Sequence, residues 1–388
     1  MGRSETAGPS DKATRLLAAC LVTPAHSLTL GAAEWNMLLR SLRRNALLGT
    51  FAEMLAQAAL LESTPAKARI QMAHARIAAE SSRTAIRYEV NRMLRAVASY
   101  DGPLVLLKGT AYEFGQLPPK WGRVTGDVDI MVPREDINEV ERALVAAGWR
   151  IAAHDAYDQR YYRQWSHELP PLVHPLRETA IDLHHTIAPP MGRARPDASA
   201  LLGASKSTSL PRARVLAPAD MVLHSVVHLF QDEVSRPLRD LFDIDRLTRH
   251  FGRDPAFWTQ LCDHAALHRV ERPLYYALRI VRAVFQTPIP DSVTVRLDRA
   301  APNRLLSYCM DQLFRRLFAA EFSVSVGTSD RLVRYVLRAR SQWLRMPPLL
   351  LARHLAHKTV RRAGERWRRF SKQSALATIG TGVAARPE

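Results

Sequence analysis

The chain has 388 residues, a length that suits two or three domains better than one. Hydrophobic residues make up 47% of the composition and charged residues 24%, so the chain can bury a sizeable core and wholesale disorder is excluded. The three cysteines, Cys20, Cys262 and Cys309, lie far apart and form no CxxC pair. This spacing excludes a cysteine-ligated zinc site and a disulfide framework, and it favours a reduced, cytoplasmic protein.

The formal net charge of +18 is unevenly distributed along the chain. Residues 331–370 contain twelve Arg or Lys and a single acid, Glu365, so this segment carries +11 and the remaining chain +7. We therefore expect any polyanionic partner, a nucleic acid or an anionic membrane surface, to contact residues 331–370. No apolar run reaches the ~18 residues that span a bilayer, so the sequence predicts no transmembrane segment.

The first hundred residues are predicted to be helical after a short tail. Residues 1–12 are polar, which is typical of a disordered tail. Over residues 13–100 the apolar side chains recur at spacings of three and four, as in Trp35, Leu38 and Leu42. This pattern predicts an N-terminal helical region.

Residues 101–215 are predicted to form an α/β core, because short apolar or alternating segments are interleaved with turn signals. Strands are predicted near 104–107, 127–132, 149–153, 172–174 and 180–187, and helices at 109–116 and 136–147. Residues 188–213, rich in Pro, Gly and Ser, are predicted to be a loop. The expected fold class is α+β, a small mixed β-sheet core flanked by N- and C-terminal helical regions.

The remainder of the chain is predicted to be helical up to its last residues. Residues 216–328 are predicted to form a helical domain. Residues 329–370 form a basic helical segment that Pro347-Pro348 interrupts, and residues 371–388 have the composition of a disordered tail.

Three acids are the candidate catalytic and metal-binding residues. Side chains alternate between the two faces of a strand, so Asp127 and Asp129 share one face while Val128 and Ile130 point into the core. Two carboxylates ~7 Å apart along a strand repel each other unless a cation lies between them. Mg²⁺ binds one or two carboxylates together with phosphate oxygens and waters. A two-metal site usually needs a third carboxylate, for which Asp182 in a later strand is the candidate.

The order of several short motifs points to a known family. These are Leu107-Lys108-Gly109, Arg123, Asp127-Val128-Asp129, Asp182-Leu183-His184 and a helix that contains His224 and His228. Together they resemble the uncharacterised nucleotidyltransferase family of bacteria, a branch of the DNA polymerase beta-like nucleotidyltransferase superfamily. The resemblance covers roughly residues 70–250.

The resemblance implies roles for individual residues. Asp127 and Asp129 would hold both metal ions, and Asp182 would bind the metal that activates the acceptor. Gly109 would begin a helix whose amides face the triphosphate. The Gly-Ser that usually ends the first strand in the superfamily is replaced here by Lys108-Gly109-Thr110, in which Lys108 would supply charge to phosphate and Thr110 a hydroxyl. The substrate-binding residues implied in this way are Lys108, Gly109, Thr110, Arg123, Gly126 and His184.

For two of these residues a structural role is an open alternative. Arg123 either clamps the triphosphate or neutralises Asp127 or Asp129. His184 either supports Asp182 from behind or is an ordinary core histidine.

The sequence thus predicts an enzyme that uses Mg²⁺ or Mn²⁺ to move a nucleoside monophosphate from a nucleoside triphosphate such as ATP to an acceptor hydroxyl. A small molecule, a sugar, a protein and RNA are all compatible acceptors. The alternative is a non-catalytic protein that keeps the fold and holds a nucleic acid or a membrane surface through residues 331–370. Only the enzyme needs Asp129 for metal-dependent binding of a triphosphate.

Overall fold

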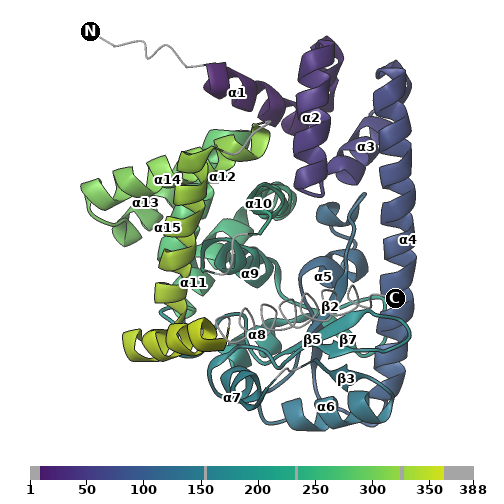
Figure 1. The fold of residues 1–388 in the computed structure, drawn as a ribbon, viewed down its shortest axis with the longest axis vertical. Coiled ribbons are helices and arrows are strands. Elements are labelled where there is room, and N and C mark those ends of the chain that lie inside the picture. The colour runs from purple at the N-terminus through teal and green to yellow at the C-terminus, as the bar shows by residue number, and fades with distance from the viewer. Residues whose placement is uncertain (1–8, 153–154, 232–234, 324–326, 362–388) are drawn as a thin grey trace, which may run out of the picture.

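A computed structural model shows an α+β architecture in which a mixed sheet lies between two helical regions (Figure 1). The structure describes residues 9–152, 155–231, 235–323 and 327–361. The fold class predicted from the sequence is therefore confirmed. The predicted C-terminal tail, 371–388, lies outside the described residues. Buried apolar side chains of the sheet and of both helical regions form one continuous core.

The sheet has seven short strands in the order β3-β4-β5-β2-β1-β7-β6. Their bounds are β1 Leu104–Leu106, β2 Asp127–Met131, β3 Arg150–Ile151, β4 Leu172–Val173, β5 Ala180–His184, β6 Lys206–Ser207 and β7 Ala213–Val215. β2 pairs with β5 in parallel and with β1 in antiparallel orientation, and β1 pairs in parallel with β7. The middle of the sheet thus holds β2 and β5 side by side, although two helices separate them in the chain: α6 Ile137–Ala146 and α7 Ala156–Trp165.

The prediction of a loop at 188–213 is wrong. This segment contains the helix α8 Ala198–Ala204, the strand β6 and the first residue of β7. These strands have only two and three residues, so they show no readable alternation. They form because β7 pairs with the free edge of β1, and β6 then pairs with β7. This pairing gives hydrogen-bond partners to main-chain groups of β1, which lies far away in the sequence.

Helix α7 was also absent from the predicted order of elements. None of its residues is fully buried, so the apolar stripe that reveals a helix in the sequence is weak. The helix begins after Asp155, whose carboxylate accepts a hydrogen bond from the main-chain N–H of Asp158 at 2.7 Å.

The N-terminal helical region supports the sheet from one side. Its helices are α1 Pro9–Val22, α2 Ala32–Arg44, α3 Leu48–Gln57 and α4 Ala66–Ala96. α4, at the right of Figure 1, has no Gly or Pro and runs from the N-terminal helices down to β2 and α6. The Ser82 hydroxyl on α4 accepts a hydrogen bond from the main-chain N–H of Thr125 at 2.9 Å. The same hydroxyl donates a hydrogen bond to the main-chain carbonyl of Thr125 at 2.8 Å. α4 therefore fixes the turn from which β2 starts.

The C-terminal helical region is arranged around α9 Pro218–Gln231, which packs against four other helices of this region. The helices of this region after α9 are α10 Pro237–Phe251, α11 Pro255–Leu267, α12 Glu271–Phe285, α13 Asp291–Leu297, α14 Arg304–Phe322 and α15 Thr328–Arg345. A further helix occupies residues 348–361 after the break at Pro347, where the sequence predicts an interruption. Among the described residues, no helix is both long and apolar enough to cross a bilayer.

Candidate functional site

The parallel pairing of β2 with β5 brings the three predicted acids onto one face of the sheet. Asp129 is the register partner of Asp182, and Asp127 lies two residues earlier on β2. Parallel neighbours are ~4.8 Å apart and residues in register point to the same face. The residues that alternate with the acids, such as Val128 and Ile181, are fully buried on the opposite face.

Asp129 is held by two cationic or hydrogen-bonding side chains. Lys108, at the start of α5 Lys108–Phe114, places its Nζ 2.7 Å from Oδ1 of Asp129, and His184 Nε2 lies 3.1 Å from the same oxygen. The Asp129 side chain is only 2% exposed, whereas that of Lys108 is 27% exposed. Burial opposes ionisation of both groups, but their mutual attraction prevails: the pKa of Asp129 is lowered and that of Lys108 raised.

Asp182 is in the opposite electrostatic situation. Its Oδ1 is buried and has no hydrogen-bond partner. Burial, followed by the negative charges of Asp129 and Glu168, raises the pKa of Asp182 to about 7. Burial and the charge of Asp129 also raise the pKa of Asp127. An unsatisfied buried carboxylate oxygen beside two further carboxylates is the donor set that a hard divalent cation such as Mg²⁺ prefers.

A model of a family described as uncharacterised nucleotidyltransferases matches residues 31–286, well over half of the chain. The chain belongs to this family. The match confirms the resemblance drawn from the motifs and extends it into the N-terminal helices and α12. No curated protein and no solved structure matches the chain.

A fourth carboxylate, Glu168, lies at the edge of the acid cluster and was missed by the sequence analysis. Glu168 forms an isolated bridge with His184, and its Oε2 lies 3.5 Å from His184 Nε2. His184 Nε2 therefore stands between Asp129 and Glu168, rather than against Asp182 as the supporting role would have it. An isolated bridge leaves no periodic pattern in the sequence. The only sequence signal for Glu168 is that it is an acid shortly before a predicted strand.

Arg123 and Thr110 make contacts that favour structural roles. The Arg123 guanidinium forms an ion pair with Asp243 of α10 and lies over the Tyr112 ring, 5.2 Å from its centroid. The Thr110 side chain is fully buried, and its hydroxyl donates to the main-chain carbonyl of Asp127 at 3.4 Å. Neither contact involves the carboxylates of the acid cluster.

The two predicted glycines are placed differently. A Cβ on Gly109 would come within 2.8 Å of the Thr125 side chain, so only glycine fits where α5 passes the turn before β2. Gly126 is exposed, directly before Asp127, and a Cβ there would meet nothing within 4 Å.

A second cluster with metal-ligand chemistry is a hydrogen-bonded network instead. Asp220 Oδ1 lies 2.6 Å from His264 Nδ1 and 3.2 Å from His268 Nε2. The main-chain N–H of Asp197 donates to His268 Nδ1 at 3.1 Å, so the proton of this ring is on Nε2 and points at Asp220. A metal ion on Nε2 would require an N–H at Nδ1, where a donor already lies. The cluster therefore ties α9 to α11.

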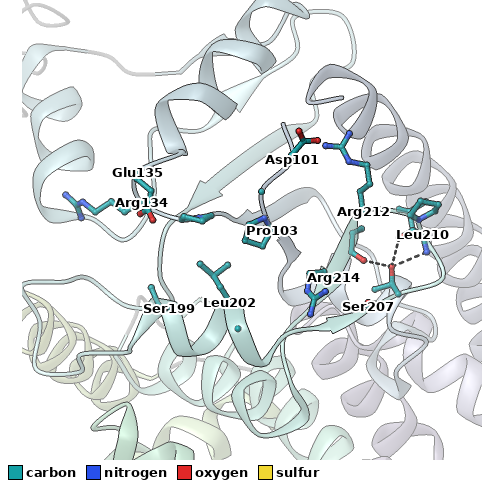
Figure 2. A pocket seen from close by; sticks show the side chains of 17 residues that line it. Asp101, Pro103, Arg134, Glu135, Ser199, Leu202, Ser207, Leu210, Arg212 and Arg214 are labelled. Carbon is teal, nitrogen blue, oxygen red and sulfur yellow. Dashed lines mark hydrogen bonds between the residues drawn. The ribbon is translucent and has the colours of Figure 1, made fainter. Parts of the chain in front are cut away.

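A cavity of about 960 Å³ lies at the opposite end of the sheet from Lys108. Figure 2 shows Arg134 and Glu135, which follow β2, on one side, and Arg212 beside Asp101 on the other. Arg212 donates to the carbonyl of Ala98 at 2.7 Å. This cavity shares none of its lining residues with the acid cluster.

Proposed function

We propose that the protein is a Mg²⁺-dependent nucleotidyltransferase that moves a nucleoside monophosphate from a nucleoside triphosphate to an acceptor hydroxyl. One observation carries the proposal: three carboxylates share one face of two adjacent strands, and one of them has a buried, unpartnered oxygen. In the reaction the acceptor oxygen bonds to the α-phosphorus, the bond from this phosphorus to the β-phosphate oxygen breaks, and pyrophosphate leaves.

Asp127, Asp129 and Asp182 would hold Mg²⁺ or Mn²⁺. When bound, the ions neutralise charge on the triphosphate and on the attacking and leaving oxygens. Asp182 is also the candidate residue to take the proton of the acceptor hydroxyl.

In the structure, the Lys108 ammonium group occupies the place of a metal ion beside Asp129. Its ammonium is 2.7 Å from an Asp129 oxygen, and it is the residue that the family resemblance assigns to phosphate. We infer that a divalent cation held by Asp129 would replace Lys108 there, which would leave the lysine able to contact the triphosphate. The lysine thus offsets part of the repulsion among the three carboxylates.

The test uses nucleoside triphosphates labelled in either the α- or the γ-phosphate, incubated with the purified protein, Mg²⁺ and a cell extract. We expect label to pass to an acceptor only from the α-position, with loss of transfer in EDTA and in Asp129→Asn. The exposed residue Asp298 supplies the matched control, Asp298→Asn, which should keep full activity. Transfer of the γ-label, or full activity of Asp129→Asn, would disprove the proposal.

The non-catalytic alternative has its own observation in its favour. Residues 331–361 contain eight Arg or Lys and no acid. A protein that only binds would show no labelled product with any triphosphate, and its partner would be lost on removal of the segment from residue 331 onward, with steep salt dependence. The labelling experiment and this truncation together separate the two functions.

A further inference from the structure

Helix α15 has three distinct faces. Its buried face, with Val333, Leu337 and Ser341, packs on α9 and α14. At 100° per residue, a second set of side chains falls within an arc of about 100° on the side of the helix that points away from the buried face. This set consists of Leu332, Tyr335, Val336, Ala339 and Trp343, and all five are exposed. Leu332 is 62% and Tyr335 70% exposed, so the arc is an apolar stripe that the described residues leave uncovered.

The third face of α15 is basic. Arg331, Arg334, Arg338 and Arg345 fall together within about 60° of arc, between the buried face and one edge of the apolar stripe. Arg331 and Arg338 are exposed, Arg334 forms an ion pair with Glu321 of α14, and Arg345 lines a cavity together with Lys108. The helix therefore presents a row of arginines next to a row of apolar side chains.

The helix at 348–361 continues this composition. In Figure 1 it is the yellow helix that crosses the lower end of α15. Its inner side is fixed to α7, where the His357 ring stacks on Tyr157 with centroids 3.9 Å apart. Its outer side exposes Leu349 at 88% and Val360 at 73%, together with Arg353.

We propose that α15 and the helix at 348–361 form a surface that binds anionic phospholipid membranes. An amphipathic helix with aliphatic and aromatic side chains beside a basic row lies in the headgroup region, where the apolar side chains enter the lipid and the arginines contact anionic headgroups. The proposal is independent of the catalytic one. It would place the acid cluster close to the membrane surface, because the end of α15 lies near that cluster. The main-chain carbonyl of Leu344 accepts a hydrogen bond from Arg193, and Arg345 shares a narrow cavity with Lys108.

Charge argues against the other occupants of the stripe. Residues 362–370 of the same chain carry four arginines and one glutamate, so the arginines of α15 repel them. A second copy of the chain would bring two basic rows together and is disfavoured for the same reason. A nucleic acid would satisfy the arginines, but it offers nothing to exposed aliphatic side chains such as Leu332, Val336 and Leu349.

The test is co-sedimentation of the full-length protein with vesicles of phosphatidylcholine, alone or with about 30 mol% phosphatidylglycerol. We expect binding to be about tenfold tighter with the anionic lipid, and Leu332→Glu and Arg331→Glu each to weaken it about tenfold. The matched controls are Val295→Glu and Arg299→Glu, which change exposed residues of the same types outside α15. Far-UV circular dichroism checks that every variant is folded.

Three outcomes would overturn the proposal. The first is equal binding, or none, with neutral and anionic vesicles. The second is an equal loss of binding in Leu332→Glu and Val295→Glu. The third is tight binding of a single-stranded RNA oligonucleotide that is unaffected by Leu332→Glu, which would assign the surface to nucleic acid.

Discussion

Replacing Lys108 by Met should destabilise the protein because it leaves the buried carboxylate of Asp129 without its cation. The pair has a separation of 2.7 Å, and the Asp129 side chain is 2% exposed. Removing one partner of a buried ion pair costs ~3–5 kcal/mol. His184 Nε2 remains 3.1 Å from Asp129, so we expect the low end, a loss of about 3 kcal/mol in the free energy of unfolding.

The loss is measured by urea denaturation of four proteins: wild type, Lys108→Met, Asp129→Asn and the double variant. A coupling energy of about 2 kcal/mol is expected, because Asn in the double variant carries no charge that needs the lysine. The exposed lysine Lys67 supplies the control, and Lys67→Met should change stability by less than about 0.5 kcal/mol.

The same variants test whether Lys108 occupies the place of a metal ion. Mg²⁺ has to displace Lys108 in the wild type but not in Lys108→Met, so it should bind the variant more tightly. If the binding is tenfold tighter, saturating Mg²⁺ should stabilise the variant by about 1.4 kcal/mol more than it stabilises the wild type. Additive effects in the cycle would refute the pairing argument. Equal stabilisation of both proteins by Mg²⁺ would refute the displacement argument.

Three further predictions concern Asp182 and Arg123. Calorimetric titration at a series of pH values should show Mg²⁺ affinity rising between about pH 6 and pH 8, because the metal competes with a proton on Asp182, whose pKa is about 7; an affinity independent of pH would contradict this. The folded pKa of Asp182 lies above its unfolded value, so the folded state binds this proton more tightly and the free energy of unfolding should fall as pH rises from about 4 to about 7. Urea denaturation should show this fall to be smaller in Asp182→Asn, and an unchanged slope would count against it. Arg123→Ala should lower stability by about 3 kcal/mol, since it removes the partner of buried Asp243, and Arg123→Lys should recover part of the loss; weaker triphosphate binding at unchanged stability would instead show that Arg123 is a clamp.

The sequence predicts the strands of the site well, because each has the signal that periodicity can detect. β2 and β5 both alternate acids with buried apolar residues, so their faces follow from the residues alone. Their adjacency does not, since it depends on pairing between segments that α6 and α7 separate. The residues alone make Asp182 a candidate third carboxylate only if its strand pairs beside that of Asp129, and the family resemblance implies that the three acids act together.

Long-range partners were beyond sequence reasoning. Arg123 pairs with Asp243, which follows it by 120 residues, and Glu168 reaches His184 through a single bridge. Neither contact has a periodic signature. The division of the chain into domains at residues 100, 215 and 328 stays a prediction, and so do the catalytic, metal-binding and substrate-binding roles of all the predicted site residues.

Equilibrium dialysis with labelled nucleoside triphosphates, with and without Mg²⁺, tests the central claim that the three acids form a metal-dependent triphosphate site. We predict that the wild type binds triphosphate only when Mg²⁺ is present and that Asp129→Ala abolishes this binding. Asp101→Ala, at the cavity on the far end of the sheet, should bind like the wild type. Triphosphate binding that persists in Asp129→Ala, or that is lost in Asp101→Ala, would contradict the account.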